Sequence, residues 1–327
     1  MRLLITGGTG FIGARLAVMA RDAGHEVRVT GLVNTPAEAT RKEALDAAGI
    51  EVLVRSLEPP VPAALVEGVD AIVHLAAAQH EMNVPDAHFE QINLRATQGL
   101  FEAARESAVG RFVQGSTIGV YGAREGTIDE TTPVAPDNVY GRTKLAAERW
   151  LRAQDSGPEV VVIRIGETYG PGDMRLLKLF QGVARGRFPR LGKGRNLHHP
   201  VYVDDLVRGL LAAARAPIER GEVFLFAGPE PVTTDQMVAC VAAALDRPAP
   251  GLRLPLGPFK VVATVLESTL RPLGIQPPLH RRRLDFFTKS LAFSTERARH
   301  RLGFVPEVGF AEGARLTAAW YRSQGLL

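Results

Sequence analysis

TGGTGFIG, residues 6–13, is the stretch of the sequence that decides the fold. It follows the apolar run RLLIT and precedes a helical pattern. Gly7 permits a tight turn, Gly10 lets the backbone approach a pyrophosphate, and Gly13 lets the helix pack closely on the strand. The N–H groups of the first helical turn then face the anion along the helix dipole. This order of strand, glycine turn and helix predicts a nucleotide-binding unit.

Strand-like and helical segments alternate through the first half of the chain, as in a series of βαβ crossovers. The predicted strands are residues 2–6, 25–30, 50–54, 70–77, 111–117 and 159–166. The predicted helices are residues 11–24, 35–49, 88–107 and 140–154. We therefore expect an α/β fold built on a Rossmann-type doubly wound parallel sheet.

Proline and glycine become denser after Gly166, and the helical patterns become shorter. We expect a dinucleotide-binding Rossmann domain over residues 1–166, followed by a smaller, mostly helical and discontinuous substrate-binding lobe mainly over residues 167–327. HPVYVDD (199–205) and EVFLFAG (222–228) have the composition of strands, and we expect both to return to the sheet.

Composition and charge limit the classes of protein to which this chain can belong. A net charge of +4 over 327 residues and 46% hydrophobic residues are typical of a globular protein. The short basic run HRRR favours solvated arginines or an anion site over a nucleic-acid surface, so we expect no nucleic-acid partner. The single cysteine, Cys240, allows no internal disulfide, and we expect a cytoplasmic protein. The apolar segment 255–270 is broken by charged residues, so we expect no membrane span. It predicts a lid or core helix, and peripheral contact with a membrane surface is the alternative.

The clearest candidate for chemistry is YGRTK, which places Tyr140 and Lys144 four residues apart on one face of a helix. A tyrosine has a pKa of about 10, and a neighbouring ammonium lowers it toward the range of an acid–base catalyst. Ser116 and Thr117 end a predicted strand, where side chains of a doubly wound sheet face the ligand crevice. Thr117 is therefore the candidate that binds the substrate oxygen next to Tyr140.

Further short motifs follow along the chain: VHLAA, INLRAT, RIGETYGPGD, VYVDDL, PVTTDQM and ERARHRLGFVPEVGF. With the glycine turn and YGRTK, they resemble the extended short-chain dehydrogenases/reductases of the NAD-dependent epimerase/dehydratase type over essentially the whole chain. That family uses a catalytic Ser or Thr, a Tyr and a Lys, which the resemblance carries to Thr117, Tyr140 and Lys144. It also implies a nicotinamide cofactor that carries the hydride, a small-molecule substrate, and a homodimer through the helices that carry Asn93 and Tyr140.

The resemblance extends to two binding sites. It implies that Asn93 braces the strand bearing Thr117 and that Lys144 holds the ribose hydroxyls. The expected cofactor-binding residues are Gly7, Gly10, Phe11, Ile12, Gly13, Gly31, Asn34, Ser56, Leu57, Leu75, Ala76, Ala77, Asn93, Tyr140, Lys144 and Ile165. The expected substrate-binding residues are Ser116, Gln79, Thr168, Tyr169, His198 and His199.

The segment after the second predicted strand departs from the family pattern. The position that usually holds a carboxylate for the ribose 2′-hydroxyl falls on Gly31, and no arginine for a 2′-phosphate follows directly. Asn34 is close, whereas a helix is expected to carry Arg41 and Lys42 away. After the third strand the family's GDL reads RSL here. NAD is the expected cofactor, and NADP is the alternative.

Other departures narrow the reaction. Family dehydratases carry an Asp-Glu pair directly after the catalytic Thr, where this chain has Ile-Gly, so dehydration is not expected. Sugar-nucleotide epimerases commonly carry an arginine where this chain has His198. The pattern G-x-G-x-N (192–196) resembles the 3β-hydroxysteroid dehydrogenase branch and favours a bulky, poorly charged alcohol or ketone. A UDP-sugar 4-epimerase, with Arg195 or Arg281 to Arg283 on the diphosphate, and a catalytically silent relative are the alternatives.

The remaining histidines predict no metal site. His74 lies in a buried strand and is expected to be a satisfied core residue. His80, Glu81 and His88 follow that strand, where a surface loop is favoured over a metal site because no close-packed ligand pattern is present.

Overall fold

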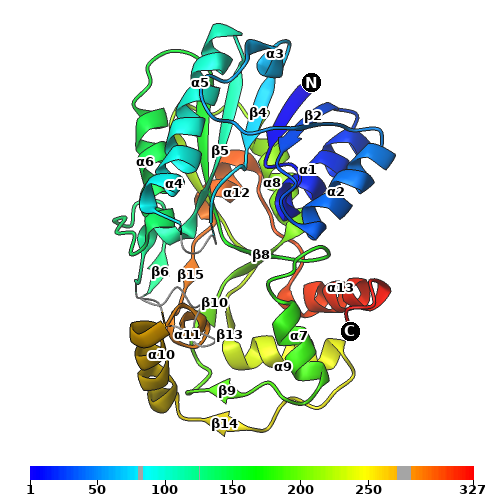
Figure 1. Ribbon diagram of the computed structural model, residues 1–327, viewed down its shortest axis with the longest axis vertical. Coiled ribbons are helices and arrows are strands. Elements are labelled where there is room, and N and C mark those ends of the chain that lie inside the picture. Colours follow the sequence, from blue (N-terminus) through cyan, green and yellow to red (C-terminus); the bar gives the residue numbers. More distant parts are fainter. Residues whose placement is uncertain (80–83, 125, 271–280) are drawn as a thin grey trace.

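The computed structural model describes residues 1–79, 84–124, 126–270 and 281–327 (Figure 1). Its seven-stranded sheet contains β1 (Arg2–Thr6), β2 (Glu26–Gly31), β3 (Glu51–Val54), β4 (Ala71–His74), β5 (Arg111–Thr117), β7 (Glu159–Ile165) and β12 (Glu222–Phe226). The spatial order is β12-β7-β5-β4-β1-β2-β3, and every neighbouring pair is parallel. The predicted doubly wound sheet is confirmed.

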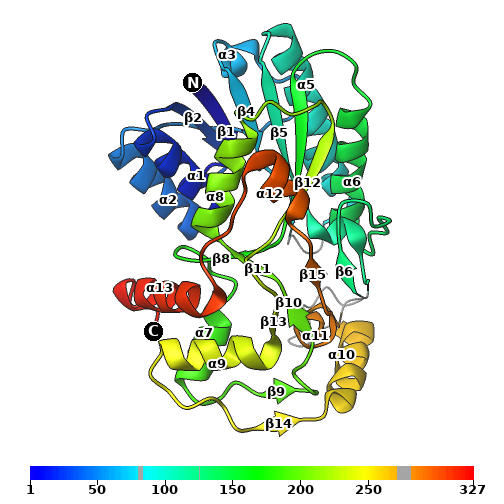
Figure 2. The same cartoon turned by 180° about the vertical axis from the view of Figure 1, so that it is seen from behind.

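Helices cover both faces of the sheet (Figures 1 and 2). One face carries α1 (Phe11–Asp22), α2 (Pro36–Ala47), α8 (Val203–Ala213) and α12 (Glu296–Leu302). The other carries α3 (Ala63–Val66), α5 (Ala96–Glu106) and α6 (Val139–Arg152). The strands read as continuous apolar runs because they are buried on both sides: Leu3 and Ile5 pack in the first layer and Leu4 in the second.

The crossover from β4 to β5 differs from the single helix predicted over 88–107. It consists of α4 (Asp86–Glu90), a π-helical turn (Gln91–Arg95) and α5. A π-turn inserts one extra residue into a helix, and such turns are frequent at functional sites. Here it carries Asn93, which is fully buried.

The second lobe is built from helices and two-stranded sheets. Its helices are α7 (Leu177–Ala184), α9 (Thr234–Ala244), α10 (Leu256–Leu270), α11 (Arg281–Thr288) and α13 (Phe310–Ser323). The strand pairs are β8 (Glu167–Tyr169) with β11 (Pro200–Tyr202), β9 (Arg190–Leu191) with β14 (Arg253–Leu254), β10 (Leu197–His198) with β13 (Val232–Thr233), and β6 (Thr127–Ile128) with β15 (Ala292–Phe293).

One of the two expected returning strands does return to the sheet. EVFLFAG forms β12 at the edge of the large sheet, beside β7. The prediction for HPVYVDD was wrong, because β11 pairs with β8 outside the large sheet and helix α8 already begins at Val203. β8 therefore acts as the link between the sheet and the second lobe.

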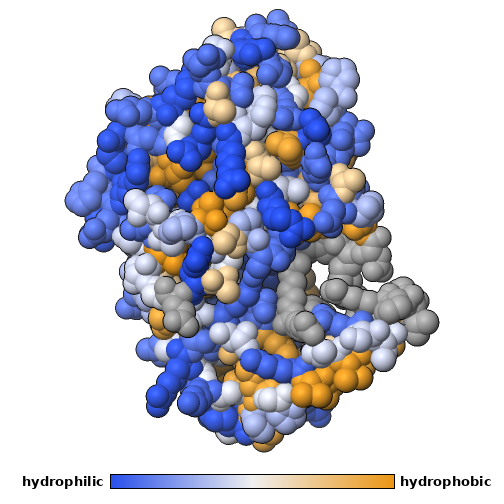
Figure 3. All heavy atoms as spheres, turned by 90° about the vertical axis from the view of Figure 1, so that its left-hand side faces the viewer, coloured by the Kyte–Doolittle hydropathy of each residue, from blue (hydrophilic) through white to orange (hydrophobic). Residues whose placement is uncertain are grey.

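Segment 255–270 forms helix α10 on the surface of the second lobe rather than a core helix. Only its Ala263 is fully buried, whereas Val261, Val262 and Val265 are each about half exposed or more. Figure 3 shows apolar side chains gathered at this end of the molecule. Within the described ranges, no helix is long and apolar enough to cross a membrane.

Candidate active site

Two cavities meet at the glycine turn between β1 and α1. Their volumes are about 420 and 430 Å³. Both are lined by Gly7, Gly10, Leu75 and Ala77, so together they form one elongated site that runs across the carboxyl ends of β1, β4 and β5. Ligands of doubly wound sheets bind at this edge.

The geometry of the glycine turn fits a dinucleotide. Gly7 has φ +66°, and a Cβ on it would lie 2.7 Å from the backbone nitrogen of Ala76. A Cβ on Gly13 would lie 2.3 Å from the carbonyl oxygen of Gly7. Gly10, the N-cap of α1, has no side chain to cap the helix, so the first-turn N–H groups of α1 remain available to an anion.

One of the cavities continues along the end of β2. Its lining includes five expected cofactor residues: Gly31, Asn34, Ser56, Leu57 and Ala76. A Cβ on Gly31 would lie 2.4 Å from Thr9 Oγ1, so a carboxylate side chain at this position would require the Thr9 side chain to shift.

A carboxylate reaches the same cavity from α2 instead. Glu38 lines it and accepts hydrogen bonds from the backbone N–H groups of Asn34 and Thr35, both 2.9 Å long. Sequence reasoning missed Glu38, although the capping-box pattern T-x-x-E was available to find it. A carboxylate at this end suits a ribose hydroxyl and disfavours a 2′-phosphate.

Arg41 was expected to be carried away by its helix, and that prediction was wrong. Its side chain lines the cavity beside Phe11. Its guanidinium donates to the carbonyl oxygens of Thr9 and Gly172, at 3.4 and 3.0 Å. Arg41 therefore ties the glycine turn to the loop that follows β8.

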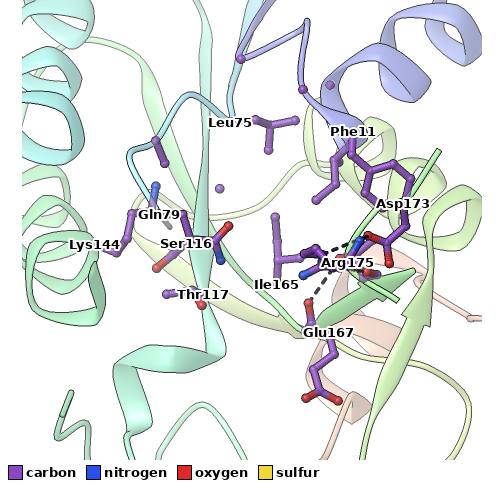
Figure 4. A pocket seen from close by; sticks show the side chains of 18 of the residues that line it. Phe11, Leu75, Gln79, Ser116, Thr117, Lys144, Ile165, Glu167, Asp173 and Arg175 are labelled. Carbon is purple, nitrogen blue, oxygen red and sulfur yellow. Dashed lines mark hydrogen bonds and ion pairs between the residues drawn. The ribbon is translucent and has the colours of Figure 1, made fainter. Parts of the chain in front are cut away.

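The other cavity contains the expected catalytic residues. Thr117 from β5 and Tyr140 and Lys144 from α6 line it, together with Phe11, Ile12, Gly13 and Ile165. In Figure 4, Lys144, Gln79, Ser116 and Thr117 lie on one side, opposite Phe11 and Asp173. Helix α6 begins at the N-cap Asn138, whose side chain accepts from the N–H of Gly141.

Lys144 is 1% exposed, and burial lowers its pKa from 10.5 to about 8, against the opposing attraction of Glu148. Thr117 Oγ1 accepts a hydrogen bond of 3.0 Å from the N–H of Gly119. Because a hydroxyl also carries one proton, Thr117 can still donate to a substrate oxygen. Ser116 lines the cavity too, but its hydroxyl donates to the buried carboxylate of Glu148.

The substrate end of this cavity is lined by Gln79 and Thr168, as expected, and by Glu167, Asp173 and Arg175, which were missed. Arg175 donates to Asp173 Oδ1 at 3.1 Å and to the carbonyl oxygen of Thr168. The Glu167 side chain is 40% exposed. Its position in the RIGETYGPGD motif, directly after β7, was the available signal.

Glu167 points from this cleft toward the second lobe (Figure 4). Burial alone raises the pKa of Glu167, but the hydrogen bond with His198 and the charge of Arg175 outweigh burial and lower it. The carboxylate is therefore charged at neutral pH.

Three expected substrate-binding residues lie outside the large cavity. Tyr169 is 1% exposed and packs in the core of the second lobe, with its hydroxyl 3.4 Å from the carbonyl oxygen of Gly309. His199 is also buried and bonds the backbone at both ring nitrogens. His198 lines two smaller cavities with Glu167, its Nδ1 lying 3.3 Å from that carboxylate. His199 is thus structural, whereas Tyr169 and His198 both line a smaller cavity that adjoins the substrate end, together with Glu167, Thr168 and Arg175.

Asn93 does not touch the cofactor cavities, and its expected place against the strand of Thr117 was wrong. Its side chain accepts from the N–H of Ala78 at 2.8 Å and donates to the carbonyl oxygen of Ala78 and to Thr143 Oγ1, both at 3.0 Å. Asn93 therefore fixes the segment after β4 against α6, the helix that carries Tyr140 and Lys144.

His74 is a satisfied core residue, as predicted. Its ring nitrogens lie 2.6 Å from Thr6 Oγ1 and 2.9 Å from Thr97 Oγ1. His80 and Glu81 lie outside the described residues, and His88 lines the cavity that continues along the end of β2. The described part of the chain holds no cluster of three or more His, Cys, Asp or Glu side chains suited to a metal ion.

Comparison with known proteins identifies the family. The model of the NAD dependent epimerase/dehydratase family matches residues 3–226. The chain is 30% identical to the Bacillus subtilis (strain 168) protein named "Uncharacterized UDP-glucose epimerase YtcB", over 76% of this chain and 84% of that protein. It is 28% identical to the 2-alkyl-3-oxoalkanoate reductase of Stenotrophomonas maltophilia (strain K279a), over 96% of this chain and 98% of that protein.

Among solved structures, UDP-glucuronic acid 4-epimerase from Bacillus cereus in complex with NAD shares the fold, with a TM-score of 0.81 at 20% identity, over 99% of both chains. Members of the matched family are enzymes of the extended short-chain dehydrogenase/reductase type, and their cofactor is NAD. The sequence motifs, the parallel sheet and the glycine turn agree with this match. The chain belongs to the NAD-dependent epimerase/dehydratase family.

Proposed function

We propose that this enzyme interconverts a secondary alcohol and a ketone on a bulky, poorly charged substrate, as an NAD-dependent dehydrogenase or reductase. The observation that carries the proposal is the charged carboxylate of Glu167 at the substrate end of the cavity. The name of the reductase relative gives a bulky ketone as its substrate, which agrees with the proposed reaction but adds one carboxylate charge.

Tyr140, Thr117 and Lys144 have different roles in the proposed reaction. Bound NAD supplies the hydride acceptor for alcohol oxidation. Tyr140, as a phenolate, takes the hydroxyl proton while the carbinol carbon loses its hydrogen with the bonding pair, so that a ketone and a neutral phenol result. Thr117 donates a hydrogen bond to the same oxygen, and the ammonium of Lys144 favours the phenolate. Reduction of a ketone follows the same path in reverse.

The charges at the substrate end argue against a diphosphate. The two arginines that line this cavity are already engaged: Arg175 is paired with Asp173, and Arg41 is bonded to backbone carbonyl oxygens. Glu167 adds a second carboxylate, whose charge a diphosphate bound at this end would meet. A diphosphate carries two or more negative charges and would be repelled, whereas an uncharged substrate would not.

A UDP-sugar 4-epimerase that keeps its NAD bound is the second candidate. Half of the Arg175 side chain is exposed, so it is available to a diphosphate. The side chains of Arg281 to Arg283, which the sequence offers for the same role, lie outside the described residues. The names of two of the compared proteins are those of UDP-sugar epimerases.

Absorbance of NADH separates the two candidates. The purified enzyme with excess NAD is presented with a panel of hydroxysteroids and 3-hydroxyalkanoates, and separately with UDP-glucose and UDP-glucuronic acid. Stoichiometric NADH formation with a member of the first group supports the dehydrogenase. Conversion of a UDP-sugar without net change in NADH refutes it in favour of the epimerase.

Two variants test the residue roles. Tyr140→Phe should abolish turnover while calorimetric binding of NAD is kept, because the ring remains and only the hydroxyl is lost. Glu167→Gln should admit UDP as an inhibitor that the unchanged enzyme does not bind. Glu230→Gln, which neutralises an exposed carboxylate in another loop, is the matched control. Turnover that survives in Tyr140→Phe would overturn the catalytic assignment.

The homodimer and the cytoplasmic location also stay predictions. A homodimer through α5 and α6 would place two catalytic helices at one interface, and native mass spectrometry tests it. Alanine-to-glutamate changes on the outer face of these helices would then give monomers.

A further inference from the structure

A buried ion pair lies directly beneath the catalytic residues. Glu148 on α6 and Arg164 on β7 have side chains that are 1% and 5% exposed. Arg164 Nη2 lies 2.8 Å from Glu148 Oε2, and its Nε lies 3.3 Å from both carboxylate oxygens. Burying two charges carries a large desolvation cost, and apolar residues of similar size often replace such a pair without loss of stability. Its presence here therefore calls for a role.

Hydrogen bonds extend this pair into the site. Ser116, the neighbour of Thr117 at the end of β5, donates to Glu148 Oε1. Arg164 Nη1 lies 2.8 Å from the hydroxyl of Tyr121, which donates to the carbonyl oxygen of Asp129. β5 and β7 are neighbours in the sheet, with Ser116 opposite Arg164. The pair thus joins α6 to the two strand ends that flank the catalytic cavity.

Glu148 also acts on Lys144, which lies one helical turn earlier on the same face of α6. Its negative charge opposes the effect of burial on the pKa of Lys144. The other titratable groups near Lys144 are Tyr140 on α6 and His74 on β4. Burial and the charge of Lys144 lower the pKa of His74 to about 3, so His74 is neutral and does not stabilise the ammonium.

We propose that Glu148 is a positioning residue of the active site: held by Arg164 and Ser116, it keeps Lys144 cationic and fixes the end of β5 that carries Thr117. The proposal rests on the proposed function, because that function assigns Lys144 and Thr117 their roles. Glu148 itself touches neither the cofactor nor the substrate. Its carboxylate is paired with Arg164, and its charge also favours the ammonium of Lys144 from one helical turn away, so loss of that charge removes this attraction.

The charge of Lys144 can be measured without knowing the substrate. The chain has six lysines, so ε-carbon-13 labelling of lysine gives few resonances, and Lys144→Arg assigns the one of interest. In Glu148→Gln, which keeps the shape and an acceptor for Ser116, the titration midpoint of Lys144 should fall by about one pH unit or more. Glu148→Asp should restore part of the shift. Glu102→Gln, on the exposed face of α5, should leave the midpoint unchanged.

Glu148→Gln leaves the guanidinium of Arg164 buried without its partner, which can prevent folding. The double variant Glu148→Gln with Arg164→Met removes both charges, and in it the Lys144 midpoint should still lie below that of the unchanged protein. An unchanged midpoint in whichever of these variants folds would overturn the proposal. That result would leave the proposed function standing, since turnover in Tyr140→Phe tests it separately.

Discussion

Lys144→Met should make this protein more stable while removing its activity. Lys144 is 1% exposed, and its pKa is lowered from 10.5 to about 8, chiefly by burial. The folded state therefore disfavours the charged amine relative to the unfolded chain. Methionine has a similar length and needs no hydration, so it removes this penalty. Turnover should be lost because the phenol of Tyr140 would then have no ammonium beside it.

The magnitude follows from the two pKa values. The difference between 10.5 and about 8 corresponds to about 3 kcal/mol of unfolding free energy. For 327 residues the entropy of unfolding is about 0.7 kcal/mol per degree, so the melting temperature at pH 7 should rise by about 4 °C. Calorimetry or fluorescence-monitored melting resolves a change of this size.

The stability gained by Lys144→Met should depend on pH in a definite direction. A lysine whose pKa is lower in the folded state penalises folding fully below the folded pKa, and the penalty vanishes above the unfolded pKa. The advantage of Lys144→Met should be complete at pH 7, shrink as the pH rises from about 8, and disappear near pH 10.5. Lys178→Met, at an exposed lysine, is the control that should show no such trend. A variant that is less stable at pH 7, or whose advantage persists at high pH, would refute the reasoning.

Three further substitutions, two at glycines of the cofactor site and one at Asn93, have expected outcomes. Gly13→Ala should weaken NAD binding at least about tenfold in calorimetry, since its Cβ would lie 2.3 Å from a carbonyl oxygen of the same turn. Gly251→Ala, in open space, should bind NAD normally. Gly31→Asp should also weaken NAD binding, because its Cβ would lie 2.4 Å from Thr9 Oγ1, and tighter binding would contradict this. Asn93→Ala loses three buried hydrogen bonds and should cost about 2–4 kcal/mol in urea denaturation, and a loss below about 1 kcal/mol would show that they are not needed.

The sheet and the site's chemical groups were predictable because they depend on local patterns. Strand and helix periods predicted the Rossmann-type core, and the glycine turn and YGRTK predicted where the cofactor and the acid–base pair meet. The motifs around them identified the family. The catalytic roles of Thr117, Tyr140 and Lys144 remain predictions, although these three residues do line one cavity.

Features that depend on contacts between separate helices and strands were not predictable. The sequence predicted one continuous helix across the π-turn that points Asn93 at α6, and it did not show that Tyr169 and His199 turn into the core. Arg41 returns to the glycine turn because α2 packs beside α1, a contact between elements rather than a pattern within one. The pairing of Glu148 with Arg164 likewise joins a helix to a strand.

The close approach of Gly31 to Thr9 has a consequence for how this enzyme selects its dinucleotide. Thr9 crowds the customary place for the selecting carboxylate, and we expect Glu38, which lines the same cavity and caps α2, to take over that task. One side chain would then serve both cofactor recognition and the stability of the helix start. Engineering the enzyme toward a phosphorylated dinucleotide by replacing Glu38 would fray the start of α2, so a successful redesign must supply a new cap along with the new charge.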